Sequence, residues 1–170
     1  MGYASLFVSF ILLGLLLPSL TQAKGRAQSI QCVNNLKQIG LAMKIWALDH
    51  EDAFPFNVST TNGGTMEVTG VIPADGFLKD AAAHFTVLSN ELSVTKILVC
   101  PADSKVAAAG FADLRADNIT YQLRAGPDVS DNDPQQILAI CPIHQHALFS
   151  DGSVQQRAAK QLRSKQAEQP

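Results

Sequence analysis

The first fifty residues carry two hydrophobic patterns in succession, and the first is continuous. The stretch from Tyr3 to Leu20 has no charged side chain and consists mostly of aliphatic residues and Phe. As a helix it would be about 27 Å long at ~1.5 Å per residue, close to the ~30 Å hydrocarbon core of a bilayer. We therefore expect residues 1–23 to form a hydrophobic membrane segment, with apolar side chains that include Tyr3, Phe7, Phe10, Leu13 and Leu16.

Two other interpretations of this stretch stay open. A cleavable signal sequence would end after Ala23, where small and polar residues follow the apolar run, and would release a chain that begins at Lys24. A buried core helix would need a much larger protein to cover all of its faces. The orientation is also open, because Lys24 and Arg26 follow the span and favour a cytoplasmic domain, whereas the cysteines favour an oxidising compartment.

The second pattern is amphipathic and predicts that the same helix continues beside a globular domain. Apolar residues recur at intervals of four and three positions, which places them on one helical face. No proline interrupts residues 19–54, and Pro55 marks the latest possible end of the helix. We expect this face to pack on the domain through Cys32, Leu36, Ile39, Met43 and Trp46, with Gly40 allowing a close approach.

The rest of the chain predicts short elements. Residues 57–76 are rich in Gly, Thr, Asn and Ser and are typical of a loop, and residues 77–92 have apolar positions at helical spacing. Asp151-Gly152 lies between two apolar runs and predicts a hairpin with a tight two-residue turn. The expected strands are Ile97–Val99, Asn118–Leu123, Gln136–Ile140 and the two arms of the hairpin within Ala147–Gln155. The predicted fold class is α+β, a long N-terminal helix packed on a small antiparallel sheet over residues 24–156, followed by a basic tail at 157–170.

Several motifs of this chain resemble the bacterial prepilin-type, pseudopilin-like proteins. The matching segments are Leu16-Leu17-Pro18-Ser19-Leu20, the run from Cys32 to Ala42 that contains Asn34-Asn35-Leu36-Lys37-Gln38, and the acidic stretch before Phe54-Pro55. Near the other end, Phe149-Ser150-Asp151-Gly152-Ser153-Val154 is similar to the ending of the H-x9-DG group, with Cys141-Pro142 at the position of its His-Pro. The leader departs from the family, because Phe7 stands where its members have Glu.

The resemblance implies a pilin-like fold and a structural role. The chain would be a membrane-anchored subunit of a type II secretion or type IV pilus-like system, single-pass in the bacterial inner membrane with its domain on the periplasmic or extracellular side. Its partners would be membrane lipid and other pilin-like subunits. The alternative is a secreted or periplasmic binding module released after Ala23.

Composition and motif content exclude several other classes. Thirteen basic against fifteen acidic residues leave a net charge of −2, which argues against a protein that binds nucleic acid through its phosphates. The chain has no G-x-S-x-G, no Walker motif, no dinucleotide fingerprint and no H-E-x-x-H. We therefore expect no enzyme, no catalytic residues and no small-molecule substrate.

The three cysteines allow at most one internal disulfide. Cys100 and Cys141 each end a strand-like run and each precede a proline, so this pair is favoured, with Cys32 buried as a small hydrophobe. Pairs that include Cys32, or three reduced and buried thiols, remain possible.

Two groups of residues are candidate metal ligands. Cys141, His144, His146 and Asp151 have suitable ligand types at close spacing, which matches no established zinc pattern and is also typical of a solvated hairpin. Asp128, Asp131 and Asp133 offer hard oxygen ligands in a turn-rich loop, similar to the calcium loop of the major type II secretion pseudopilin. Solvated turn acids are the commoner interpretation of such a loop, so we expect no cofactor, with calcium at these three residues as the one alternative.

Overall fold

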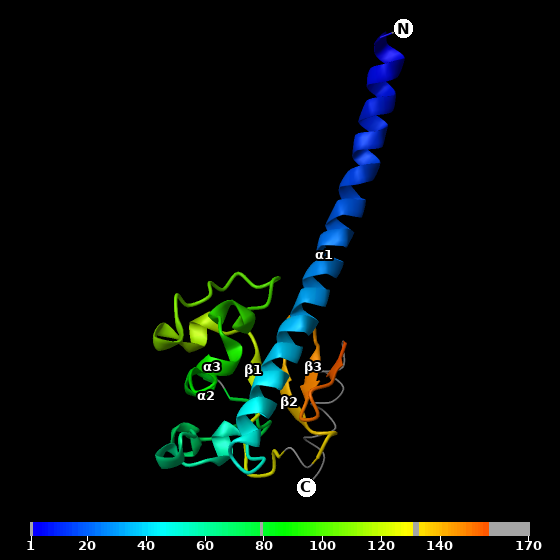
Figure 1. Ribbon diagram of the computed structural model, residues 1–170. Helices are drawn as coiled ribbons and strands as arrows, with labels where there is room; N and C mark the ends of the chain where they lie inside the picture. Colours follow the sequence, from blue (N-terminus) through cyan, green and yellow to red (C-terminus); the bar gives the residue numbers. More distant parts are fainter. Residues whose placement is uncertain (1, 79, 131–132, 157–170) are drawn as a thin grey trace.

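The computed structural model describes the backbone of residues 2–78, 80–130 and 133–156, and the side chains of this part from Leu20 onward. Its main feature is a single helix, α1 (Gly2–Leu48), of 47 residues. The C-terminal half of α1 lies along the globular part, and the N-terminal half projects away from it (Figure 1). The predicted basic tail at 157–170 lies outside the described residues.

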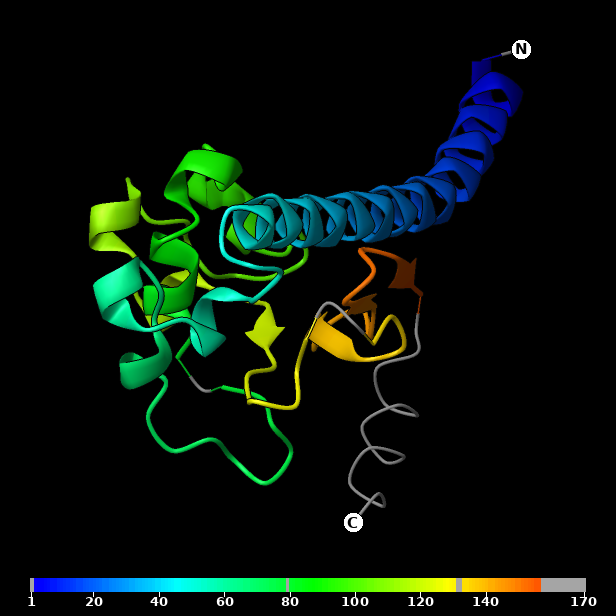
Figure 2. The same ribbon diagram turned by 60° about the horizontal axis from the view of Figure 1, so that its bottom comes forward.

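A four-stranded antiparallel sheet forms one side of the globular part. Its strands follow one another in space as in the sequence, and each pairs with the next. They are β1 (Gln122–Leu123), β2 (Ile137–Ile140), β3 (Ala147–Phe149) and β4 (Val154–Gln155). The predicted α+β class, with a long helix on a small antiparallel sheet, is confirmed. In Figure 2, strands β2 and β3 lie below the C-terminal half of α1, and the short helices lie to the left of its end.

Short helices make up most of the other side. The predicted helix over 77–92 is two pieces, α2 (Ala82–Thr86) and α3 (Ser89–Leu92). The Thr86 hydroxyl donates back to the Ala82 carbonyl at 2.8 Å, a contact that bends helices and accompanies the break. The 3-10 helices are η1 (Pro55–Asn57), η2 (Thr60–Asn62), η3 (Met66–Val68), η4 (Thr95–Leu98), η5 (Phe111–Asp113) and η6 (Ala116–Asn118).

Two strand predictions are wrong in whole or in part. The run Ile97–Val99 lies mostly within η4, because a short apolar run does not distinguish a strand from a buried helical turn. The run Asn118–Leu123 begins in η6, and only its last two residues pair with β2. The apolar pattern located the buried residues here but not the backbone conformation.

The C-terminal hairpin has a longer turn than its Asp-Gly pair predicts. The Phe149 amide donates to the Ser153 carbonyl at 2.9 Å, which leaves a three-residue loop from Ser150 to Gly152. Gly152 adopts a positive φ of 84°, the left-handed conformation that closes loops of this length. The hairpin is therefore present, but its predicted two-residue turn is wrong.

The apolar face of α1 is buried in the main core. Cys32, Leu36, Ile39 and Met43 are fully buried, and Trp46 is 6% exposed. They pack with Phe85, Leu88 and Leu98 from the short helices and with Leu138, Ala139 and Leu148 from the sheet. The face that carries the sequence pattern is thus the face that joins the helix to the domain.

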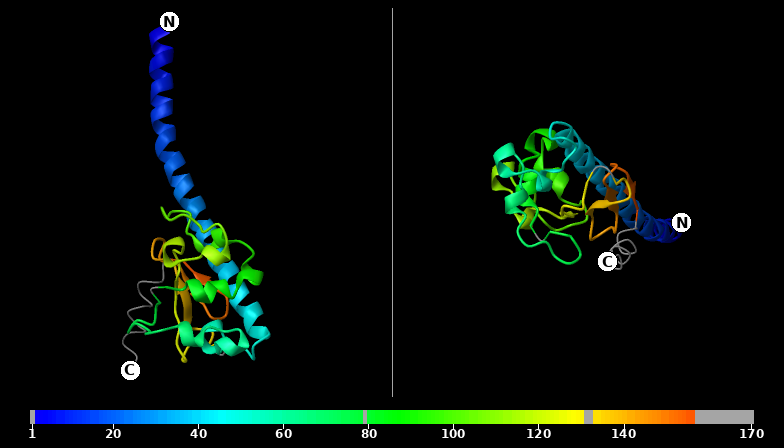
Figure 3. Two further views of the ribbon diagram at one scale, coloured as in Figure 1. Left: turned by 90° about the vertical axis from the view of Figure 1, so that its left-hand side faces the viewer. Right: turned by 90° about the horizontal axis from the view of Figure 1, so that it is seen from below.

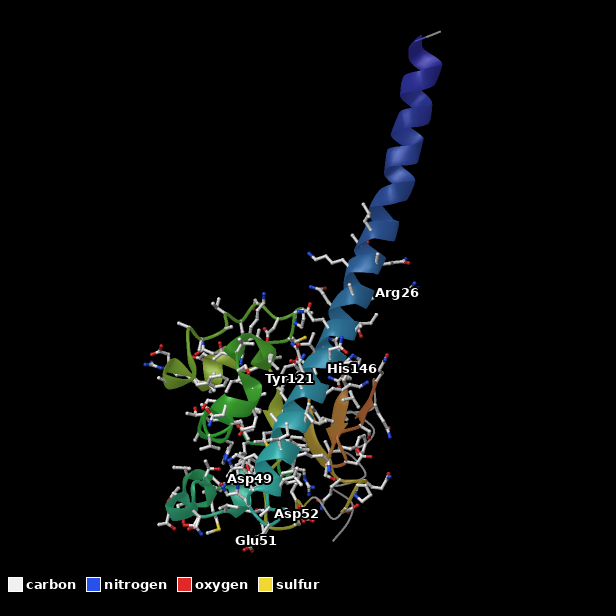
Figure 4. All side chains as sticks on the ribbon, viewed as in Figure 1. Arg26, Asp49, Glu51, Asp52, Tyr121 and His146 are labelled. Carbon is white, nitrogen blue, oxygen red and sulfur yellow. The ribbon has the colours of Figure 1, made fainter. Side chains whose placement is uncertain are left out.

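Helix α1 ends seven residues before Pro55. The Asp52 amide donates to the Ala47 carbonyl at 3.0 Å and closes the last turn. Glu51 and Asp52 both have positive φ values, 57° and 59°, which reverse the chain toward the domain. Side chains of Asp49, Glu51 and Asp52 lie at this end of the helix (Figure 4).

Gly40 provides a stability prediction with an internal control. A Cβ at Gly40 would lie 2.7 Å from Cδ1 of Leu148, a fully buried side chain. Overpacking of this kind costs about 1–3 kcal/mol, whereas removing a helical glycine gains about 1 kcal/mol. We expect Gly40→Ala to lower the free energy of unfolding by about 1 kcal/mol. Gly25→Ala, on the same helix with nothing within 4 Å, should leave it unchanged or raise it. Denaturant titration measures the free energy of unfolding of both variants, and an equal change in the two would contradict this packing.

His84 predicts how stability depends on pH. Burial lowers the pKa of His84 to about 4 from its ordinary 6.5, against an opposing effect of Asp80, and its Nδ1 lies 2.6 Å from the Thr65 hydroxyl. Between these values the unfolded chain binds a proton that the folded chain does not. The His84 contribution is thus complete above pH 6.5 and is lost as the pH falls to 4, by about 3 kcal/mol. Unfolding measured across this range should show a shallower pH slope in His84→Gln, and an identical slope would contradict the assignment.

Over the part of the chain whose side chains are described, no helix combines the length and hydropathy of a membrane span. The predicted membrane side chains Tyr3, Phe7, Phe10, Leu13 and Leu16 lie outside that part. The backbone there is helical and continuous with the rest of α1 (Figure 3).

Candidate metal centre

Four side chains from distant parts of the sequence meet beside α1. Cys32 comes from α1, Cys100 follows η4, Cys141 directly follows β2, and His144 lies in the turn between β2 and β3. Their three sulfur atoms and one imidazole nitrogen all lie within 4.8 Å of one another. The cysteines are completely buried and His144 is half-buried. Among the described residues, this is the one group of at least three His, Cys, Asp or Glu side chains close enough to hold a metal ion.

Two similar turns place Cys100 and Cys141. Each cysteine precedes a proline, which fixes φ for a turn and supplies no N–H of its own. The backbone amides that follow turn back toward the sulfur. Ala102 donates to Cys100, and both Ile143 and His144 donate to Cys141, the last at 3.4 Å.

The ligand-bearing turns are held against one face of α1. Gln28 Nε2 donates to the Pro101 carbonyl at 2.8 Å, and Asn35 Nδ2 donates to the Val99 carbonyl at 3.2 Å. Gln28 and Asn35 lie one helical turn before and after Cys32, so the three side chains share a face. Asn35 is only 7% exposed, although its side chain is polar.

An outer layer of polar contacts surrounds the cluster. The Tyr121 hydroxyl donates to Cys32 Sγ at 3.6 Å. The rings of His144 and His146 are stacked with centroids 5.4 Å apart, and His146 Nε2 lies 3.0 Å from the Ser29 hydroxyl on α1. Tyr121 and His146 lie at about the same height along α1 (Figure 4). The Tyr121 contact therefore orients the cysteine of the helix, whereas His146 packs beside His144 with its own Nε2 directed to Ser29.

The environment shifts the pKa values of the three thiols in different directions. Hydrogen bonds from Cys100 and Cys32, together with the backbone amides, lower the pKa of Cys141 to about 3 despite its burial. The hydrogen bonds that Cys32 makes to Cys100 and Cys141, and its burial, raise the pKa of Cys32. The hydrogen bond to Cys141 likewise raises the pKa of Cys100. Among the three thiols, Cys141 is the one whose thiolate form the surrounding hydrogen bonds favour.

Three sulfur ligands and one imidazole can hold a metal ion in four-coordinate geometry. The Cys100 Sγ and His144 Nδ1 atoms are 3.2 Å apart, so these two ligands already face each other. With all four positions supplied by the protein, such a centre leaves no place for substrate. The arrangement fits a structural metal better than a catalytic one.

The favoured Cys100–Cys141 disulfide is absent from the structure, where all three cysteines are free and buried. The sulfur atoms of Cys100 and Cys141 lie in one cluster with the ligand atoms of Cys32 and His144. The pairing of Cys100 with Cys141 stays a prediction.

The alternative of a calcium site is not supported. The Asp128 carboxylate makes an ion pair with Arg124 at 2.7 Å, and Asp133 accepts a hydrogen bond from the Gln135 amide. Asp131 lies outside the described residues. Both described carboxylates therefore make contacts within their own loop. Among the described residues, neither belongs to a group of three or more His, Cys, Asp or Glu side chains that could hold a metal ion.

Two of the four candidate ligands near the C-terminus belong to the site. Cys141 and His144 are part of the cluster, whereas His146 contacts Ser29 and the exposed Asp151 accepts from the Ser153 amide at 2.7 Å. The missing half was Cys32 and Cys100. The available signal was the repeated Cys-Pro pair, each marking a turn at the end of a buried run.

Comparison with protein-family models, with curated proteins and with solved structures gave no match.

Proposed function

We propose that this chain is a membrane-anchored, pseudopilin-like structural or assembly subunit of the bacterial cell envelope, of the kind used in type II secretion or type IV pilus-like systems. The observation that carries the proposal is the division of α1. Residues 20–27 are exposed, and burial against the domain begins only near Gln28. At ~1.5 Å per residue, the part of α1 before Gln28 extends about 39 Å from the domain.

The sequence of this projecting part supports an apolar environment around it. Tyr3–Leu20 carries no charge, and a helix apolar on all faces is not stable when surrounded by water. Lipid, or the equivalent helices of neighbouring subunits, would cover it. The domain would remain outside the bilayer and contact other pilin-like subunits.

Membrane fractionation of the full chain tests this proposal. Expressed in a bacterial host, the chain should stay with the membranes after an alkaline carbonate wash. Replacing Leu13 and Leu16 together by Arg should release it, because charges at the centre of a span cost about 2.5–3.5 kcal/mol each.

A matched control uses the same substitution elsewhere on α1. Leu41 and Leu48 are 59% and 74% exposed on the part of the helix beside the domain. Leu41→Arg with Leu48→Arg should leave the membrane association intact. Soluble wild-type chain, or equal release of both double variants, would contradict the anchor.

A further inference from the structure

We propose that Cys32, Cys100, Cys141 and His144 form a structural zinc site that locks α1 onto the domain. The inference rests on the convergence of four ligand atoms within 4.8 Å, on hydrogen bonds aimed at their sulfurs, and on the absence of an open coordination position. It does not depend on whether the chain is anchored in a membrane.

The distances fit zinc without rearrangement of the backbone. Zn–S and Zn–N bonds of about 2.3 and 2.0 Å in a tetrahedron place sulfurs about 3.8 Å apart and sulfur about 3.5 Å from nitrogen. The Cys100–His144 pair is at 3.2 Å, and no pair of ligand atoms exceeds 4.8 Å. Shifts of about 1 Å or less, within reach of side-chain rotation, complete the geometry.

The donor set selects the metal. Three thiolates and an imidazole are the soft and intermediate ligands of a Cys3His zinc site, whereas calcium and magnesium require oxygen. Zinc also binds N and S ligands more tightly than iron(II) in the order of divalent metals. All four ligands come from the chain itself, which is the arrangement of a structural site.

The surroundings suit the charge of the bound state. Zn²⁺ with three thiolates carries a net charge of −1, and a buried charge needs hydrogen-bond donors. Amides of Ala102, Ile143 and His144 and the Tyr121 hydroxyl all donate to the three sulfurs. Such outer donors orient ligands and strengthen metal binding, so Tyr121→Phe should weaken zinc affinity about tenfold.

Because Cys32 lies on α1, a metal at this site would connect the helix to the domain. Cys32 is the ligand contributed by α1, and the others come from the turns after η4 and after β2. Zinc would therefore cross-link the long helix to both halves of the domain at one point. A force transmitted along α1 would reach the domain through this centre as well as through the apolar core.

Metal analysis of the purified full chain tests the proposal. The protein, prepared in detergent with reductant and supplied with zinc, should hold one zinc per chain. Cobalt(II) in its place should show sulfur-to-metal charge transfer and the strong visible bands of tetrahedral coordination. Cys32→Ala, Cys141→Ser and His144→Gln should each lower zinc affinity at least tenfold.

His146→Gln is the matched control, because His146 stacks on His144 but contacts Ser29 and lies outside the ligand set. It should retain one zinc. Since the metal content of the wild-type protein is measured directly, the test remains decisive even where a variant fails to fold. Zinc-free wild type with reduced thiols, a disulfide between any two of these cysteines, iron in place of zinc, or zinc retained in all three ligand variants would overturn the proposal.

Discussion

Replacing Trp46 by Ala is expected to lower the free energy of unfolding by about 3–5 kcal/mol, the range for large aromatic residues removed from a core. Trp46 is 6% exposed and belongs to the cluster in which Met43 and Ala47 of α1 meet the domain. Its ring also stacks on His50 with centroids 3.5 Å apart. The substitution would remove both the buried area and this ring contact, and leave a cavity near the C-terminal end of α1.

Denaturant unfolding of the full chain in detergent measures this loss. Leu41→Ala is the control, since Leu41 is a large apolar residue of α1 that is 59% exposed and should change stability by less than about 0.5 kcal/mol. If the two variants had the same stability, the apolar stripe of α1 would not be what joins the helix to the domain.

Removing the metal is expected to have an effect of similar size. Zinc that binds only the folded chain stabilises it by about 4 kcal/mol when free zinc is 1,000-fold above the dissociation constant. A strong chelator should therefore lower the melting temperature of the wild-type protein sharply. The loss has a structural cause, because without the metal α1 keeps its apolar contacts but loses its link at Cys32.

Cys141→Ser provides the comparison for chelation. Because the variant lacks one ligand, its melting temperature in zinc should match that of the chelated wild type, and chelator should not change it further. Wild-type melting that is indifferent to both zinc and chelator would contradict a stabilising metal in this protein.

The fold could be predicted where the hydrophobic pattern was long or distinctive. The stripe from Cys32 to Trp46 has helical spacing over fifteen residues, and the same residues are buried in the structure. The strand over residues 136–140 is a short apolar run, and β2 is buried on every residue. The prediction failed at Ile97–Val99, where three apolar residues carry no period and lie mostly in a 3-10 helix that contacts α1.

The candidate site could be predicted only in its local half. Cys141 and His144 are three residues apart, so their proximity is visible in the sequence. Cys32 and Cys100 reach the same point because α1 packs between the short helices and the sheet, a tertiary arrangement that no local pattern encodes. The calcium alternative is not supported, because the Asp128 carboxylate is paired with Arg124, a contact that the run of acidic residues in the sequence does not reveal.

The central claim of this proposal is that helix α1 stays intact. Its N-terminal part is embedded in the membrane, and its C-terminal part packs on the domain. The intact mass of the protein, recovered from the membrane and soluble fractions of its host, tests this most directly. We predict a membrane-bound chain that retains Tyr3–Leu20. A soluble chain that begins at Lys24 would contradict the proposal and leave a secreted or periplasmic binding module as the function.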